Sequence, residues 1–450
     1  MLLRILRDTL RPSKDEPDGA EAESARGEEL FPDAPERSVV VIIYGPSRSN
    51  PFHGMSVLFQ EELARRGLYC HAVEWGAAVW SNPQFANLIF DRKVRYCISW
   101  AGVGASIETT LAGKQENVWA ASKTPLFKLM GDHPAYFLDL HRSPSSLFVN
   151  VYGFQEHRDF FTRNLSPKGY SAIVPLVHLD PLPPSDIDFE AKKQGKIYFL
   201  KNGNDPEALR RRWQARLPSK VAGALLALSE ELLASLPVER SWTIEERVVR
   251  YFADLGIDVA GRTKFLSLYI AQLDDYMRRV KSAMIVQSLL DFPIEVHGEK
   301  WEHIDFSGRR ATLVPYGDYT RSKELIREAL AVLDMSPNTY SLPHERFVRC
   351  ASRHTLCLTN HSEYLAREFA PLGQPLFDFT PDSIRATVGA ALEDPHGHVE
   401  AGRRIGAEFK RRHSLDDLFD FFDMLAEQIG VQEGGDPMIQ EFFSWPPQFV

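Results

Sequence analysis

Short apolar runs that alternate with helical patterns constrain the fold of this chain more than any other feature of its sequence. In the first half the apolar runs lie at 38–44, 69–74, 94–100, 126–130 and 147–150, and helical patterns lie at about 55–66, 83–91 and 155–164. Parallel strands need crossover connections of this length, which are usually helices. The alternation therefore predicts a doubly wound parallel sheet.

A second series of strand and helix patterns follows the proline-rich connector at 175–184. Its apolar runs lie at 196–200, 293–298, 312–315, 331–335 and 355–358. Helical periodicity from 217 to 290 interrupts the series, which predicts a helical insertion. The predicted fold class is α/β, with two Rossmann-like domains. The predicted division is a disordered tail (1–37), a first domain (38–184), a second domain with its insertion (185–385), and C-terminal helices with a tail (386–450). The end of that tail, 442–450, is predicted to pack on a surface.

Charge and cysteine content exclude several classes of partner. The net charge of the 450 residues is −9 and no Lys/Arg cluster stands out, so a nucleic-acid partner is not predicted. Four cysteines without Cys-x-x-Cys spacing indicate neither a zinc site nor a disulfide framework, so a cytoplasmic location is predicted. No apolar run reaches about 18 residues, so no membrane-spanning helix is predicted. Residues 1–10 have an apolar face that can make a weak membrane or protein contact.

Candidate functional groups gather in the segment 333–360, which reads as strand, polar loop, helix and strand. Pro343 suits the first turn of a helix, here predicted from 343 to 353, because its fixed φ fits and its missing N–H is not needed. His344, Glu345 and Arg346 stand at the start of this helix. In a parallel sheet this edge faces the ligand crevice, and a helix N-terminus there attracts anions.

This segment contains Met-Ser-Pro-Asn, His-Glu-Arg-Phe, Cys and Leu-Thr-Asn in that order. The pattern resembles the donor-binding segment of GT-B glycosyltransferases, in particular the spore-maturation (CgeB-like) group. The resemblance covers 38–200 loosely and 290–385 more closely. Arg353-His354 depart from it, because a small residue is often found there. The resemblance implies two domains facing a cleft and a nucleotide-sugar donor. It also implies transfer of the sugar to a hydroxyl acceptor without a metal or other cofactor. It identifies no particular sugar, nucleotide or acceptor.

The resemblance also implies roles in donor binding. Glu345 would hydrogen-bond hydroxyl groups of the ribose or donor sugar, or simply stabilise its helix. Arg346 would pair with the diphosphate, remain solvated, or bind an Asp of its own domain. Four residues would line the donor loop or serve as turn and cap residues: Asn338, Tyr340, Ser341 and His344.

Strand ends of the second domain supply further candidates. Lys201 and Asn202 follow the strand at 196–200 and can reach a phosphate, or form a turn. His297, Gly298 and Tyr316 also follow strands and can contact the base.

The acceptor side is predicted at Gly131-Asp-His-Pro134 in the first domain. Pro134 forces His133 toward extended geometry, which presents its ring. His133 or Asp132 would be the base or orienting group for the acceptor hydroxyl, although a structural histidine fits the same pattern. His53, at the start of an early helix, competes for this role or for the diphosphate.

Other classes of function remain open. Gly102 and Gly104 resemble part of a dinucleotide fingerprint, but Ile107 takes the third glycine position, which disfavours a dehydrogenase. Asp186 and Asp188 imitate a metal-binding Asp-x-Asp pair but lie beside the connector. The main alternative is a non-catalytic protein of the same fold that binds a glycan or nucleotide sugar and scaffolds a partner.

Overall fold

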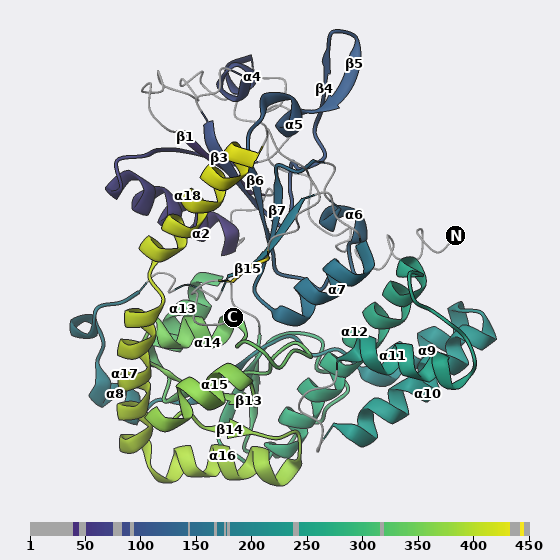
Figure 1. The fold of residues 1–450 in the computed structure, drawn as a ribbon. Coiled ribbons are helices and arrows are strands. Elements are labelled where there is room, and N and C mark those ends of the chain that lie inside the picture. The colour runs from purple at the N-terminus through teal and green to yellow at the C-terminus, as the bar shows by residue number, and fades with distance from the viewer. Residues whose placement is uncertain are drawn as a thin grey trace, which may run out of the picture. The chain divides into compact units, whose positions relative to one another are not determined.

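A computed structural model describes most of the chain after residue 38 (Figure 1). The described residues are 39–44, 51–74, 83–90, 94–142, 145–165, 169–174, 177, 181–236, 243–315, 319–432 and 442–444. Every described residue belongs to one unit of the chain, Ala34–Val450. The predicted disordered tail and the predicted contact through residues 1–10 lie outside the described residues.

The first sheet of the described chain has seven parallel strands in the order β15-β8-β7-β6-β3-β1-β2. The strands are β1 (Val39–Tyr44), β2 (Tyr69–Glu74), β3 (Val94–Trp100), β6 (Leu126–Met130), β7 (Phe148–Tyr152), β8 (Tyr170–Ile173) and β15 (Phe442–Ser444). The helices between them are α2 (Pro51–Arg65), α4 (Pro83–Phe90), α5 (Val118–Ser122), α6 (Leu138–His141) and α7 (Gln155–Leu165). The strands read as continuous apolar runs because helices cover both faces of a parallel sheet.

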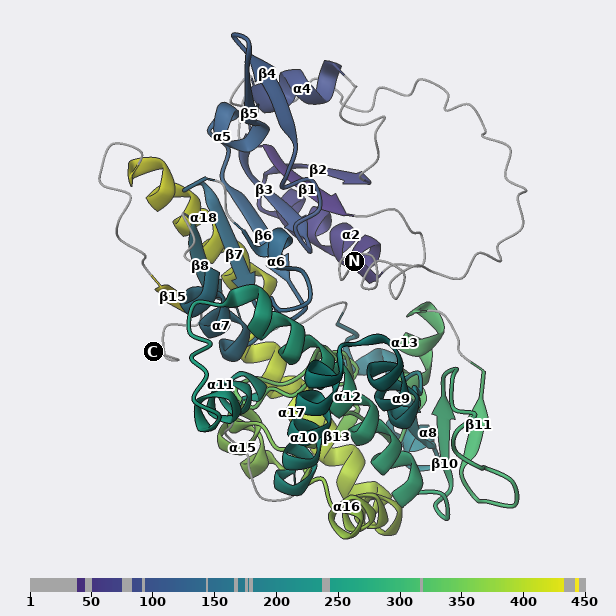
Figure 2. The same ribbon diagram turned by 90° about the vertical axis from the view of Figure 1, so that its right-hand side faces the viewer.

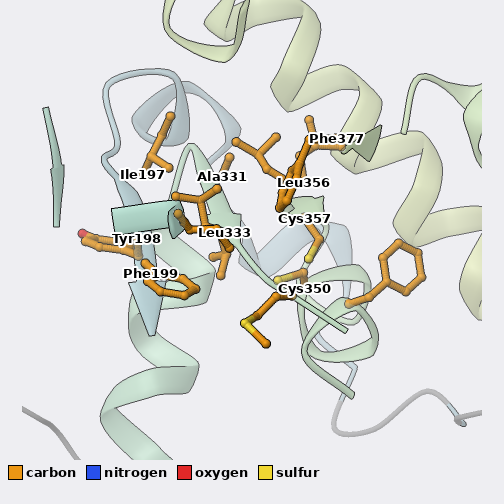
Figure 3. Packing of buried hydrophobic residues seen from close by; sticks show 14 of the residues in the cluster. Ile197, Tyr198, Phe199, Ala331, Leu333, Cys350, Leu356, Cys357 and Phe377 are labelled. Carbon is orange, nitrogen blue, oxygen red and sulfur yellow. The ribbon is translucent and has the colours of Figure 1, made fainter. Parts of the chain in front are cut away.

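The second sheet has six parallel strands in the order β11-β10-β9-β12-β13-β14. They are β9 (Ile197–Leu200), β10 (Ile294–His297), β11 (Thr312–Val314), β12 (Ala331–Leu333), β13 (Leu356–Asn360) and β14 (Leu376–Phe377). Its helices are α8 (Phe189–Lys193), α13 (Tyr319–Glu328), α14 (Glu345–Ala351), α15 (Glu363–Glu368), α16 (Pro381–Glu393) and α17 (Pro395–Arg412). Apolar side chains of the central strands and of α14 pack together in a buried core, in which Cys350 and Cys357 also lie (Figure 3).

Four helices between β9 and β10 form the insertion, and they lie together in Figure 2. They are α9 (Pro206–Arg216), α10 (Ser219–Ser235), α11 (Ile244–Asp254) and α12 (Thr263–Ser288). The insertion has its own apolar cluster, which includes Leu225, Val248 and Leu273. A capping box between Thr243 and Glu246 fixes the start of α11. The predicted fold class is confirmed: the chain has two Rossmann-like domains, and the second carries a helical insertion.

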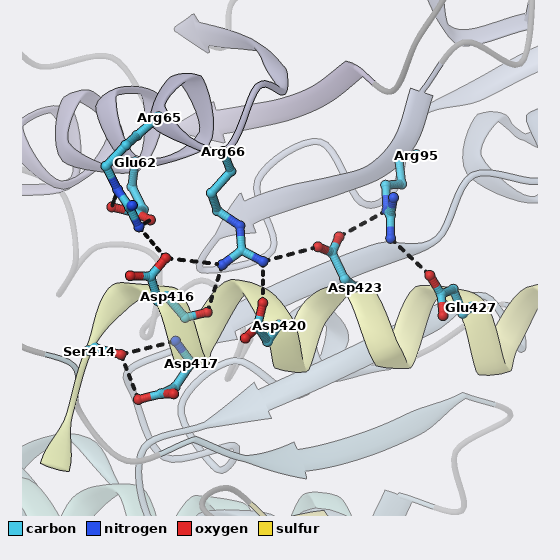
Figure 4. A network of polar contacts seen from close by, with 10 residues as sticks. All are labelled: Glu62, Arg65, Arg66, Arg95, Ser414, Asp416, Asp417, Asp420, Asp423 and Glu427. Atoms are coloured by element: carbon cyan, nitrogen blue, oxygen red, sulfur yellow. Dashed lines mark hydrogen bonds and ion pairs between the residues drawn. The ribbon is translucent and has the colours of Figure 1, made fainter.

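The end of the chain returns to the first sheet. Helix α17 ends at Arg412 and α18 (Leu415–Gln432) begins after His413 and Ser414. Phe419 of α18 packs edge-on against Phe59 of α2, with ring centroids 5.2 Å apart. Beside this contact Arg66 and Arg95 bind acidic residues along α18 (Figure 4). The C-terminal segment is therefore held by apolar packing and by ion pairs.

Several elements differ from the sequence predictions. The prediction that the tail packs on a surface is wrong for 442–444, which form β15 parallel to β8. The strand β8 and the antiparallel hairpin β4 (Glu108–Leu111) and β5 (Lys114–Asn117) were not predicted. Helix α14 spans 345–351 and not 343–353, because the backbone of His344 is extended before it and residues 352–354 form a turn after it. Every helix among the described residues is too short or too polar to cross a membrane.

Candidate active site

The carboxyl ends of β9 and β12 bring two charged residues to the same edge of the second sheet. Lys201 directly follows β9 and Asp334 directly follows β12, and these strands are hydrogen-bonded neighbours. In parallel sheets this edge is where ligands bind. The two side chains therefore mark the centre of the candidate site.

Asp334 is completely buried and is held by the side chains of His344 and Arg346. Its Oδ1 accepts a 2.5 Å hydrogen bond from Arg346 Nη1 and lies 3.2 Å from His344 Nδ1. Burial alone would raise the pKa of Asp334, but His344 and Arg346 outweigh this effect and hold the pKa at about 2. Of the three roles considered for Arg346, the structure shows the bond to an Asp of its own domain.

Lys201 has no such partner. Among the described residues, no hydrogen bond or ion pair reaches its ammonium group. Burial lowers the pKa of Lys201 to about 8, and the nearby Arg346 and Arg278 act in the same direction. Asp334 and Asp274 oppose the shift but do not contact the ammonium. Lys201 is therefore a cation at a strand end, surrounded by charge and available to an anion.

The residues predicted beside Lys201 have structural contacts. Asn202 Oδ1 accepts a 2.9 Å hydrogen bond from the Glu299 backbone N–H, which stabilises the turns after β9 and β10. A Cβ at Gly298 would lie 2.2 Å from the Lys201 carbonyl oxygen, so only glycine permits this approach. His297 Nε2 lies 3.1 Å from Glu295 Oε2, and its ring packs on Tyr198. Tyr316 lies outside the described residues.

Helix α12 of the insertion contributes two residues that the sequence analysis missed. Asp274 accepts hydrogen bonds from the Tyr136 hydroxyl at 2.6 Å and from Asn338 Nδ2 at 2.8 Å. Arg278 Nε lies 2.8 Å from the same carboxylate, at an angle outside the range of a hydrogen bond. Asp274 thus joins the insertion to Tyr136 of the first domain and to the loop after β12. The only sequence signal was the spacing Asp-x-x-x-Arg, which puts both side chains on one helix face.

Arg278 lies between the two sets of strand ends. Its guanidinium carbon is 5.9 Å from the centre of the Tyr136 ring. Asp274, Tyr136 and Asp132 raise the pKa of Arg278 against the opposing effect of burial, which is the largest single influence. Arg278 also lowers the pKa of Lys201. Its charge therefore acts on both the predicted acceptor side and the strand end of β9.

His133 is oriented by its own backbone. The Ala135 N–H donates a 3.0 Å hydrogen bond to His133 Nδ1, so the neutral ring carries its proton on Nε2. Burial lowers the pKa of His133 to about 4; Asp274 opposes the shift and Arg278 adds to it. In this arrangement His133 is a neutral hydrogen-bond donor and not a base. The side chain of Asp132 is exposed. The surrounding protein still partly desolvates its carboxylate, which raises the pKa of Asp132, and Arg278 opposes this shift.

A small cavity lies beside these residues. His133, Glu156 and His157 line it from the first domain, and Asn338 and Thr339 line it from the second. His133 of the predicted acceptor side and Asn338 of the predicted donor loop therefore share one cavity. Ile244 and Asp274 of the insertion also line it.

Glu156 binds the predicted donor loop directly. Its Oε1 accepts hydrogen bonds from the Tyr340 N–H at 2.6 Å and the Ser341 N–H at 2.9 Å. Its Oε2 accepts a 2.6 Å hydrogen bond from the Ser341 hydroxyl. The first turn of α7 is thereby tied to the loop between β12 and α14. Glu156 was not predicted, because an acidic residue in a helix's first turn is common for local reasons.

The remaining predicted residues are less connected. Glu345 is partly exposed and pairs only weakly with Arg349, at 3.6 Å. His53 lies in the first turn of α2, and its side chain is outside the described residues. Among the residues that the structure describes, no group of three His, Cys, Asp or Glu side chains is arranged to hold a metal ion.

No protein-family model matches the chain, and no curated protein sequence matches it significantly. Sucrose-phosphate synthase from Thermosynechococcus elongatus is similar in structure, with a TM-score of 0.48, 9% identity, and coverage of 88% of this chain and 100% of that one. T4 phage BGT in complex with UDP-glucose is similar with a TM-score of 0.44 and 8% identity, and the match covers 87% of this chain and 99% of that one. Anabaena HepE in complex with UDP and glucose is similar with a TM-score of 0.41 and 10% identity, and the match covers 88% of this chain and 100% of that one. At TM-scores below 0.5 these likenesses do not indicate what this chain binds, so its function is inferred from its own residues.

Proposed function

We propose that this chain is a glycosyltransferase that moves a sugar from a nucleotide-sugar donor to a hydroxyl acceptor without a metal ion. The observation that carries the proposal is the unpaired Lys201 at the carboxyl end of β9, with Arg278 nearby. The charge of Arg278 also acts on Asp132. Cations fixed at this edge suit a leaving group that becomes more negative as the reaction proceeds. The resemblance of the segment 333–360 to donor-binding segments points the same way.

Each charged residue then has a defined role. As the bond between the sugar and the diphosphate breaks, Lys201 and Arg278 stabilise the charge that develops on the diphosphate oxygens. Asp132 accepts the proton of the acceptor hydroxyl, for which its raised pKa is suitable. His133 donates from Nε2 and orients the acceptor. Glu345 binds hydroxyl groups of the donor. Arg346 keeps Asp334 ionised.

Substitutions of Lys201 and Arg278 test this proposal. We expect Lys201→Met and Arg278→Met each to weaken the binding of a nucleoside diphosphate by about tenfold or more, because each removes a charge-assisted contact. Lys196→Met is the matched control, since Lys196 lies at the opposite end of β9 and pairs with Glu295. Thermal stabilisation by UDP-, GDP-, CMP- and dTDP-sugars identifies the donor, and calorimetry then gives the affinities. Equal affinities in all three variants and the parent chain would contradict the proposal.

The alternative, a non-catalytic binding protein, rests on the engaged Nδ1 of His133, which leaves the imidazole without a free lone pair. Such a protein would be stabilised by a nucleotide sugar in the same panel. It would release no nucleoside diphosphate, whereas a transferase releases it slowly to water even without an acceptor. In the transferase, release should fall in Asp132→Asn while donor binding is retained. Measuring release and binding on the same samples separates the two functions.

A further inference from the structure

Two buried cations line a second small cavity, inside the helical insertion. The cavity lies between α10, α11, α12 and the loop after β12, and Lys281, Arg247, Asn338 and Tyr340 are among its lining residues. Lys281 is 2% exposed and Arg247 is 5% exposed. None of the described lining residues is an Asp or Glu. The interior of the cavity is therefore electropositive.

Lys281 lacks a counter-charge in contact. No hydrogen bond or ion pair reaches its Nζ from the described residues. The Nζ atom instead lies over the Phe379 ring, 4.7 Å from the ring centre. Asp274 lies two helical turns earlier, but its carboxylate is already engaged by Tyr136, Asn338 and Arg278. An aromatic face recovers only part of the hydration that a buried ammonium loses. Burial accordingly lowers the pKa of Lys281 to about 7.

Arg247 faces the same cavity from α11 and is better compensated. Its Nη1 lies 3.0 Å from Glu231 Oε1 of α10, which neutralises most of its charge. The apolar wall, which includes Leu232 and Met277, offers no further polar partner to Lys281. The unbalanced charge among the residues that line the cavity is that of Lys281.

We propose that this cavity is a binding site for a small monovalent anion, which supplies Lys281 with its counter-charge. The cavity volume of about 20 Å³ is enough for a small group and suits an ion of the size of chloride or formate. Its partly apolar wall favours an anion that gives up hydration readily. The site is independent of the proposed transferase function.

The anion would act on the loop that follows β12. Asn338 lines both this cavity and the cavity beside His133, and Tyr340 lines the first. Asn338 adopts a positive φ of 23°, which is uncommon for a residue other than glycine. An anion in the insertion would therefore help to hold the loop in this conformation.

Thermal unfolding of the full chain in sodium chloride, sodium formate and sodium gluconate at equal ionic strength tests the site. We expect chloride and formate to raise Tm in a saturable manner relative to gluconate, which is too large to enter. Lys281→Met should abolish the difference between the salts. Lys264→Met, an exposed lysine on the same helix, should retain it.

Chlorine NMR provides a second measurement that needs no variant. Binding broadens the chloride resonance, and formate should reverse the broadening by competition while gluconate should not. A parent chain that shows neither a saturable rise in Tm nor broadening reversed by formate would overturn the proposal. A Lys281→Met chain that keeps the dependence of Tm on chloride would overturn it equally. If that variant does not fold, the competition experiment on the parent chain decides.

Discussion

The hydroxyl of Tyr136 donates a 2.6 Å hydrogen bond to the carboxylate of Asp274, 138 residues further along the chain. The same carboxylate accepts a hydrogen bond from Asn338 Nδ2 and forms an ion pair with Arg278. A single acidic side chain of the insertion thus connects the first domain, the loop after β12 and the cation proposed to bind the donor. The insertion is therefore part of the candidate active site and not an appendage to it.

Asp274→Asn should destabilise the fold and weaken the binding of a nucleoside diphosphate. Removing one partner of a buried ion pair typically costs about 3–5 kcal/mol, so we expect a loss of this order in the free energy of unfolding. Denaturant titration and calorimetry measure the two effects. Asp275→Asn is a close control, because Asp275 forms the same i,i+4 contact with Arg279 at 2.8 Å in a more exposed position. An exposed pair contributes less than about 1 kcal/mol. Equal losses in both variants would show that burial of Asp274 has no special effect.

Nucleotide affinity should fall as the pH rises above about 8, the pKa of Lys201. Below this pH the ammonium is charged and attracts the diphosphate; above it the amine becomes neutral and the attraction is lost. Because a bound anion raises the pKa of Lys201, the affinity should fall by up to about tenfold per pH unit between the free and bound values. Lys201→Arg keeps its charge throughout this range and should remove the pH dependence. Calorimetric titration with UDP from pH 7 to 10 measures both profiles, and parallel profiles would refute the assignment.

Stability should be lost in acid partly through Asp334. Its pKa of about 2 in the folded chain lies below the ordinary value. The ionised form therefore stabilises the fold above about pH 4, and this stabilisation disappears as the pH falls from 4 to 2. The shift corresponds to about 2 kcal/mol. In a chain with Asp334→Asn and Arg346→Met the decrease in unfolding free energy over this interval should be smaller by that amount. The double substitution avoids leaving the Arg346 charge buried alone. An equal decrease in unfolding free energy between pH 4 and 2 in both chains would contradict the prediction.

The attachment of α18 should depend on salt. Arg66 binds Asp420, lies 3.5 Å from Asp423, and donates a 2.9 Å hydrogen bond to the Asp416 carbonyl oxygen. We expect Arg66→Met to lower stability by about 1 kcal/mol at low ionic strength and by less in 1 M salt, because these charges are near the surface. Urea unfolding at the two ionic strengths measures the difference. Arg65→Met should have a weaker effect, since Arg65 is largely exposed. A loss independent of salt would indicate that apolar packing alone holds the helix.

The sequence was sufficient to predict the fold class because both sheets are built from local strand and helix patterns. It did not predict β15, whose three residues pair with β8 far earlier in the chain. Such a short strand is stabilised by the edge it joins, and local propensity carries no information about that edge. The hairpin β4–β5 was missed for a related reason, since its charged second strand lacks the apolar alternation of a half-buried strand.

From the sequence we could propose candidate residues that directly follow a strand, but not those that lie inside a helix. Lys201 was proposed from its position after β9, and Asp334 could have been proposed after β12 by the same rule. Asp274 and Arg278 have the appearance of an ordinary surface pair on α12. Only the packing of the insertion against Tyr136 and Asn338 buries them and makes them candidates.

The chain returns from the second sheet to the first through only His413 and Ser414, between α17 and α18. His413 is anchored on the side of α17, because its Nε2 hydrogen-bonds the Tyr364 hydroxyl and its ring packs on Phe409. Ser414 belongs to the other side, because its Oγ accepts a hydrogen bond from the Asp417 N–H at the start of α18. With so little slack, a swing of one sheet domain against the other would require rotation about the φ and ψ angles of these two residues, because the peptide bond between them is planar. Ser414→Pro, which fixes φ at position 414, should slow such a motion without touching a substrate.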